Sequence, residues 1–130
     1  MKYTDYRGKN VVVTGAASGM GKATAQKLIT AGANVYAIND QPFNLAGATA
    51  LTCDVSNEQQ VEAAFSQIPD HVDSYFGVAG ISGQHSSYLK VIKVNYSANK
   101  YITEHFLQPR MKQGGSIVYV SSFGAFWWER

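Results

Sequence analysis

Residues 10–21 read NVVVTGAASGMG, and this stretch decides the fold. The β-branched run Val11–Val13, which leads into Thr14 and a glycine, predicts a buried parallel strand that stops sharply. Beyond the turn the pattern becomes helical, because small and apolar residues recur along one helix face. These residues are Gly21, Ala25, Leu28 and Gly32. The stretch therefore predicts a strand, a tight turn and a helix that lies close to a sheet.

The turn between this strand and this helix has glycines in the pattern G-x3-G-x-G. In such a turn the backbone N–H groups can face an anion, and the helix N-terminus adds about half a positive charge. Glycine also removes the Cβ atom that would block a pyrophosphate. This placement favours nucleotide binding over an ordinary strand-to-helix turn. The expected cofactor contacts in the turn are Gly15, Ala17, Ser18, Gly19, Met20 and Gly21.

The rest of the chain alternates between strand and helix patterns. We expect further strands at 34–38, 48–55, 72–79 and 116–120, and further helices at 61–68 and 88–106. Ser56 and Gln59 have the spacing of a capping box before the second helix. This alternation predicts an α/β fold, a doubly wound parallel sheet of the Rossmann type with helices on both faces. We expect one dinucleotide-binding domain over residues 1–130.

Composition and charge exclude several classes of protein. Apolar residues make up 45% and charged residues 15% of the 130 residues, which is a globular composition. The net charge of +2 comes from scattered basic residues, so we expect no nucleic-acid partner. No apolar run could span a bilayer and no apolar leader opens the sequence, so we expect no membrane partner and a cytoplasmic location.

The sulfur and imidazole side chains carry no metal-site pattern. Cys53 is the single cysteine, which excludes a disulfide framework within the chain, and its strand position predicts a small buried hydrophobe. His71, His85 and His105 lack metal-ligand spacing with any acid or cysteine, so we expect no metal.

The turn TGAASGMG at 14–21 resembles the cofactor turn of the short-chain dehydrogenase/reductase family, and further landmarks follow in the family's order. Asp54 and Val55 resemble the segment whose aspartate contacts the adenine ring. Residues 78–80, Val-Ala-Gly, resemble the end of the family's N-N-A-G strand motif. Val94-Asn95 resembles the segment with the structural and catalytic asparagine. The segment GGSIVYVSS at 114–122 resembles the strand that delivers the catalytic serine.

This resemblance implies an oxidoreductase that interconverts a secondary alcohol and a carbonyl with a nicotinamide cofactor. It implies the sheet order 3-2-1-4-5, cofactor contacts at Asp54, Val55, Ala79 and Gly80, and a homo-oligomer. The chain departs from the family pattern because Gly77 and Val78 replace two asparagines, which predicts a loss of side-chain hydrogen bonds in the central strand. This departure and the short loop before Asn95 are similar to the 3α-hydroxysteroid dehydrogenase/carbonyl reductase branch, so a hydroxysteroid is one expected substrate.

The end of the second predicted strand bears on the choice of dinucleotide. A carboxylate near this point can accept a hydrogen bond from the ribose 2′-OH and repels a 2′-phosphate. Asn39 stands where the family usually has its acidic residue, and Asp40 follows it. Ser18 is not basic, and no arginine follows the strand. NAD is therefore favoured over NADP.

The family's catalytic residues are only partly matched. Ser122 and Asn95 match the serine that polarises the carbonyl and the asparagine that supports a proton relay. In the family a tyrosine acts as general acid and base, and a lysine four residues later lowers its pKa. Tyr96 and Lys100 have that spacing, but they precede the serine strand instead of following it, so we reject them as the catalytic pair.

The expected pair would lie on the next helix, well beyond the end of the sequence at Arg130. We therefore expect the N-terminal portion of a dehydrogenase, truncated before the helix with the catalytic tyrosine and lysine, and inactive by itself. An open fifth strand beside the aromatic residues of 123–128 predicts association. Two alternatives remain open: a catalytically inert nucleotide-binding module, and a self-contained enzyme that uses Tyr96.

Overall fold

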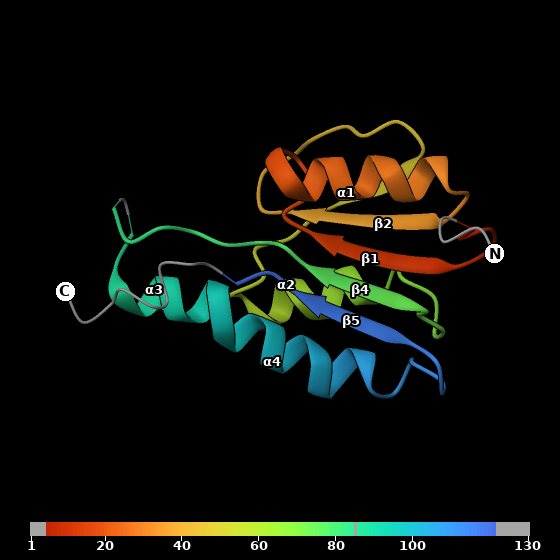
Figure 1. Ribbon diagram of the computed structural model, residues 1–130. Coiled ribbons are helices and arrows are strands. Elements are labelled where there is room, and N and C mark those ends of the chain that lie inside the picture. The colour runs from red at the N-terminus through yellow and green to blue at the C-terminus, as the bar shows by residue number, and fades with distance from the viewer. Residues whose placement is uncertain (1–4, 85, 122–130) are drawn as a thin grey trace.

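The computed structural model describes residues 5–84 and 86–121 (Figure 1). Five strands form one sheet in this part of the chain. The order across the sheet is β3-β2-β1-β4-β5, and each neighbouring pair is parallel. The strands are β1 (Asn10–Thr14), β2 (Asn34–Asn39), β3 (Ala48–Thr52), β4 (Ser74–Gly77) and β5 (Ser116–Tyr119). The expected order 3-2-1-4-5 of a doubly wound fold is confirmed.

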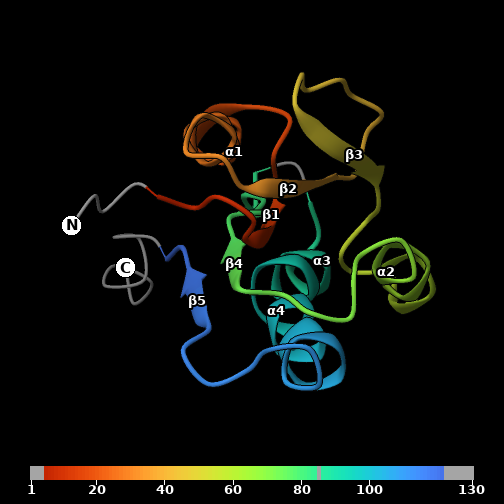
Figure 2. The same cartoon turned by 90° about the vertical axis from the view of Figure 1, so that its right-hand side faces the viewer.

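Helices cover both faces of this sheet (Figure 2). One face is covered by α1 (Gly19–Thr30), and the other by α2 (Glu58–Phe65) and by a long helical stretch. That stretch was expected as one helix at 88–106. It is continuous, but it contains two π-helical turns. Its parts are α3 (Tyr88–Ile92), η1 (Lys93–Ser97), α4 (Ala98–Ile102) and η2 (Thr103–Leu107).

The sheet separates two hydrophobic layers, because side chains of a strand alternate between its faces. Val11 and Val13 pack with Ala25 and Leu28 of α1. Val12 belongs to the opposite layer, which also contains the buried residues of α2 and of the long helix. All three valines of β1 are 0% exposed, which confirms the buried strand. The apolar face expected for the second helix is buried as well, at Val61, Ala64, Phe65 and Ile68.

Several element boundaries differ from the expectation. α2 spans Glu58–Phe65 and not 61–68, and β2 and β5 each differ by one residue. β3 ends at Thr52 and not at residue 55, and β4 is confined to residues 74–77. The capping box was wrong, since Asn57 caps α2 by accepting a hydrogen bond from the Gln60 amide at 3.1 Å. Ser56 instead donates its hydroxyl to Asp54 Oδ1 at 2.7 Å, because a carboxylate is a stronger acceptor than the groups of the helix end.

β5 lies at the edge of the described sheet. It pairs with β4, from Ser74–Ser116 to Gly77–Tyr119, and within residues 5–84 and 86–121 no strand pairs with its other side. All four residues of β5 are exposed. The aromatic segment 123–128 lies outside the described residues. Among the helices of the described ranges, none is long and apolar enough to cross a membrane.

Candidate functional site

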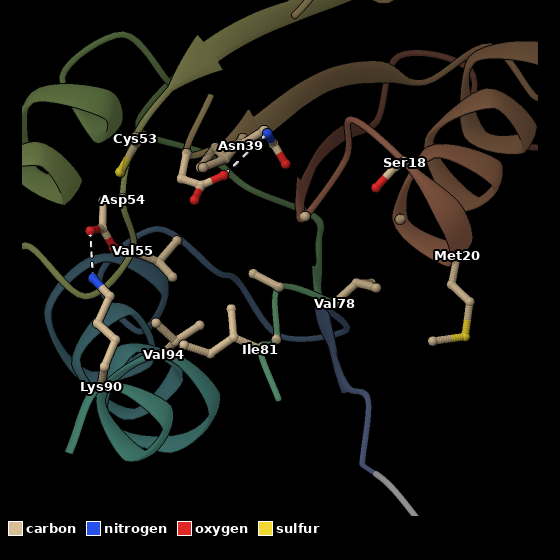
Figure 3. Close-up of a pocket in the computed structure, with 16 residues that line it drawn as sticks. Ser18, Met20, Asn39, Cys53, Asp54, Val55, Val78, Ile81, Lys90 and Val94 are labelled. Carbon is tan, nitrogen blue, oxygen red and sulfur yellow. Dashed lines mark hydrogen bonds and ion pairs between the residues drawn. The ribbon is translucent and has the colours of Figure 1, made fainter. Parts of the chain in front are cut away.

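A cleft of about 390 Å³ opens where β1, β2, β3 and β4 end (Figure 3). It lies beside the boundary between β1 and β4, where the order of the strands along the sheet reverses. In open parallel sheets, ligands bind at this position because the two neighbouring connections run to opposite faces. The cleft is lined by Gly15, Ser18, Met20, Gly21, Ile38, Asn39, Asp40, Cys53, Asp54, Val55, Val78, Ala79, Gly80, Ile81, Lys90 and Val94.

The three glycines of the first turn have different surroundings. A Cβ atom at Gly15 would lie 2.9 Å from Ala79 Cα, and one at Gly21 would lie 2.0 Å from the Gly15 carbonyl oxygen. These two glycines therefore let the turn pack against β4 and against itself. Gly19 has a φ of +55° and no atom within 4 Å of a Cβ position. Its backbone is therefore the part of the turn that a ligand can approach.

The first turn of α1 suits an anion. Ser18, its N-cap residue, forms no side-chain capping bond, and the first turn contains no acidic residue. The N–H groups at the helix start and their partial positive charge are therefore not neutralised by a side chain of this turn.

Thr14 fixes the end of β1 against the end of β4. Its buried hydroxyl oxygen accepts hydrogen bonds from the backbone N–H groups of Val78 and Ala79, each at 3.1 Å. The Ala16 N–H donates to the Ile38 carbonyl of β2 at 3.1 Å. The ends of three strands are thus connected around the glycine turn.

Gly77 and Val78 replace the two asparagines of the family motif, but β4 still has a side-chain hydrogen bond to the long helix. The Tyr75 hydroxyl of β4 donates to Asn99 Oδ1 of α4 at 2.7 Å. A Cβ atom at Gly77 would lie 2.6 Å from that same oxygen. Gly77 therefore leaves the space that Asn99 uses, and β4 is bound to the helix by Tyr75. The burial of Tyr75 raises the pKa of its hydroxyl, which stays protonated as a donor.

At the end of β2, Asn39 and Asp40 both line the cleft. The Asn39 amide donates to Asp40 Oδ1 at 3.4 Å and to the Gln41 carbonyl at 3.3 Å. These bonds hold the loop after β2, and Asp40 itself is exposed.

Beyond β3, Asp54 forms the most polar part of the cleft wall. Its Oδ1 accepts hydrogen bonds from the Ser56 N–H at 2.9 Å and the Ser56 hydroxyl at 2.7 Å, and its Oδ2 accepts one from Lys90 Nζ at 2.7 Å. Partial burial raises the pKa of the Asp54 carboxyl, but the bonds from Lys90 and Ser56 outweigh burial, and the pKa falls below its ordinary value. The site therefore contains an ionised carboxylate.

Cys53 precedes this carboxylate and is 1% exposed. Burial, with a smaller effect of the Asp54 charge, raises the pKa of the Cys53 thiol to about 11. The expectation of a small buried hydrophobe is therefore confirmed.

Ten of the twelve expected cofactor contacts line the cleft together, and Ala17 and Gly19 do not. Sequence reasoning missed six lining residues. Four are apolar residues, at Ile38, Val78, Ile81 and Val94, and the others are Cys53 and Lys90. Only Val78 and Val94 had a signal, because they stood in the quoted family segments.

A second cleft, of about 450 Å³, lies between the long helix and β5. Asn95 lines it, and its side chain exchanges two hydrogen bonds of 2.9 Å with the backbone of Ile81, a residue of the first cleft. Asn95 therefore connects the two clefts. Ser122 lies outside the described residues, and its neighbour Ser121 lines the second cleft.

Tyr96 and Lys100 also line the second cleft. Lys100 Nζ donates to Glu104 Oε1 at 2.5 Å, and this bond raises the pKa of the Lys100 ammonium above its ordinary value. The pair lies on the helix before β5, as the order of the sequence required.

Comparison with known proteins agrees with this geometry. Residues 9–127 match the short chain dehydrogenase family. The chain belongs to that family. It is 39% identical over 120 residues to a coniferyl-alcohol dehydrogenase of Pseudomonas sp. strain HR199, a match that covers 92% of this chain and 46% of the relative. It is 27% identical over 134 residues to the human 15-hydroxyprostaglandin dehydrogenase [NAD(+)], covering 88% of this chain and 50% of that protein.

A solved structure supports the fold. A short-chain dehydrogenase/reductase from Brucella melitensis superposes with a TM-score of 0.80 at 20% identity, covering 95% of this chain and 61% of that one. The chain spans about half the length of the curated short chain dehydrogenases it matches. Since the family consists of dehydrogenases that act on small molecules with a nicotinamide cofactor, the first cleft is the candidate cofactor site.

Proposed function

We propose that this chain is the NAD-binding part of a short chain dehydrogenase that interconverts a secondary alcohol and a carbonyl. The observation that carries the proposal is the first cleft, where the uncapped helix start at Ser18 and Met20 and an ionised Asp54 line one space at the switch point of the sheet, with the open backbone of Gly19 between the first two. These groups fit a dinucleotide, which has a pyrophosphate, ribose hydroxyls and an adenine base.

Each part of the dinucleotide has a proposed partner. The backbone at Gly19 and Met20 would hold the pyrophosphate, and Asp40 with Asn39 the adenosine ribose. Asp54 and Val55 would hold the adenine. When bound, the nicotinamide ring supplies the chemistry of hydride transfer.

NAD is preferred over NADP in this proposal, because Asp40 lines the cleft and a carboxylate repels a 2′-phosphate. The name of the human relative, which includes NAD(+), supports the same choice. Calorimetric titration of the chain with both cofactors tests it. We expect tighter binding of NAD(H), and equal affinities or a preference for NADP(H) would contradict the choice.

For the reaction we propose that Asn95 and Ser122 act beside the substrate carbonyl, in a parent protein whose tyrosine and lysine lie beyond this sequence. A hydroxysteroid and an aromatic alcohol are the substrates to compare, the second because of the coniferyl-alcohol relative.

We also propose a homo-oligomer, which the exposed Tyr88, Leu89 and Tyr96 of the long helix support, and a cytoplasmic location, which the single cysteine supports.

An assay of NADH oxidation with a panel of carbonyl compounds tests the catalytic part. We expect no turnover by the 130-residue chain, because general acid–base help worth about 10²–10⁴-fold is missing. The Tyr96→Phe variant is run beside it. Turnover that this variant loses would show that Tyr96 supplies the proton and that the chain is an enzyme by itself.

A further inference from the structure

We infer that Lys90 is a positioning residue of the adenine subsite: it fixes the Asp54 carboxylate toward the cleft and ties it to the long helix, which lines the cleft through Lys90 and Val94. This inference rests on the proposed dinucleotide binding and adds a residue to it that the glycine turn and the family landmarks do not point to.

The geometry brings together two elements that are distant in the sequence. Lys90 and Asp54 are 36 positions apart, one on α3 and one in the loop between β3 and α2. Lys90 Nζ lies 2.7 Å from Asp54 Oδ2 and 2.6 Å from the Ser56 hydroxyl. Both residues line the cleft, across from Ser18 and Met20 of the glycine turn (Figure 3).

Counting donors and acceptors shows what this pair offers a ligand. Among the hydrogen bonds of the described residues, Asp54 Oδ1 accepts two and Oδ2 accepts one, so Oδ2 retains one acceptor position. Lys90 uses two of its three N–H donors. An acceptor beside a donor fits a heteroaromatic edge with an amino group next to a ring nitrogen, which adenine has. The side chains of Val55 and Val94 supply apolar contact for the ring faces.

Lys90 also affects the pH range over which the Asp54 carboxyl is ionised and can accept this hydrogen bond. Burial acts on the Asp54 carboxyl to raise its pKa, and the Lys90 bond acts to lower it. Without Lys90 the carboxyl would take up a proton at higher pH than in the unsubstituted chain. A protonated carboxyl donates a hydrogen bond, so it would serve the adenine amino group less well.

The test measures ADP binding by calorimetry across a range of pH, with the variant Lys90→Met, which keeps the length of the side chain without its charge. Lys93→Met is the matched control, because Lys93 is exposed on the same helical stretch, outside the cleft, and loses the same charge. Lys90→Arg restores the charge. We expect Lys90→Met to weaken ADP binding about 10-fold at neutral pH and to move the acid limb of the affinity profile to higher pH.

Lys93→Met should bind as the unsubstituted chain does, and Lys90→Arg should recover most of the affinity. A merely structural role would lower thermal stability and weaken binding equally at every pH. Circular dichroism checks the fold, and Lys90→Gln replaces Lys90→Met if the latter does not fold. If the unsubstituted chain binds ADP and the neutral variants match it in affinity and pH profile, the inference is wrong and the proposed function stands. If the unsubstituted chain binds no ADP, the proposed function fails and the inference falls with it.

Discussion

At the scale of single residues, the cofactor turn depends on glycines that solve different problems. Gly15 and Gly21 are required because a side chain would collide with backbone atoms 2.9 and 2.0 Å away. A Cβ atom at Gly19 would collide with nothing, but Gly19 has the left-handed conformation that favours glycine, and the residue is exposed. The spacing of the three glycines identifies the turn, but only the structure distinguishes these roles.

Substitution of Gly19 should therefore affect binding more than folding. Gly19→Val should weaken NAD binding at least ~10-fold, because the new side chain extends where the pyrophosphate would approach. The left-handed backbone should cost about 1–2 kcal/mol of unfolding free energy. Gly8→Val is the matched control, since Gly8 has a φ of +74° and open surroundings but precedes β1, away from the glycine turn. Calorimetry and urea unfolding separate the two effects, and equal NAD affinity of both variants would place the pyrophosphate elsewhere.

Asp40 should determine the discrimination between the two dinucleotides. Asp40→Ser removes the charge that faces a 2′-phosphate, so NADP affinity should rise several-fold, a change on the order of 1 kcal/mol, while NAD affinity falls slightly. Asp70→Ser removes the same charge from an exposed site outside the cleft and should change neither affinity. An unchanged ratio of NAD to NADP affinity in Asp40→Ser would show that another group discriminates between the ribose 2′-OH and the 2′-phosphate.

At the scale of elements, the strand β4 shows where sequence reasoning stops. Gly77 and Val78 predicted lost hydrogen bonds, because two asparagines of the family pattern are absent. The backbone of the strand end is instead held by Thr14, and Tyr75 reaches Asn99, 24 positions away on another element. Short-range patterns cannot reveal such a partner. The same limit explains Ser56, whose hydroxyl binds Asp54 and not the helix end.

Asn99, the partner of Tyr75, occupies the space beside Gly77, and this leads to a prediction for replacing Gly77 with the asparagine of the family motif. Gly77→Asn should destabilise the chain by about 1–3 kcal/mol, because its Cβ would lie 2.6 Å from Asn99 Oδ1 and 2.9 Å from the Tyr75 ring. Asn99→Ala in the same chain should recover part of that loss by making room. Urea unfolding of the two single variants and the double variant measures the coupling. Additive losses would show that Gly77 and Asn99 do not share this space.

At the scale of the whole molecule, the topology was predictable because each strand and helix has a clear pattern and crossovers are right-handed. The cleft lies at the switch point of the sheet, and its lining includes, as expected, Gly15, Asp40, Asp54 and Gly80. The contact of Lys90 was not predictable, because it depends on where α3 lies relative to the loop after β3. Distances between elements, unlike their order, are set by packing.

The exposed edge of β5 should make this chain associate. Ile117, Val118, Tyr119 and Val120 are 37–49% exposed, and β5 offers unpaired backbone groups along its outer side in the described residues. Val118→Lys should reduce association, because a charge on an edge strand opposes pairing with another strand. Sedimentation velocity at rising concentration measures it. NAD affinity should stay unchanged, since Val118 does not line the first cleft, and an unaltered association state would place the contact on another surface.

The central position of β1 also has a consequence for synthesis on the ribosome. One side of β1 pairs with β2, the next strand in the sequence, whereas the other side has no partner until β4 has been synthesised. At roughly 5–20 residues per second, the ~40 residues between the ends of β2 and β4 take about 2–8 s to be made. During that time a strand of three adjacent valines has one unpaired edge. A nascent chain of this protein is therefore a candidate for chaperone capture in the interval before β4 emerges.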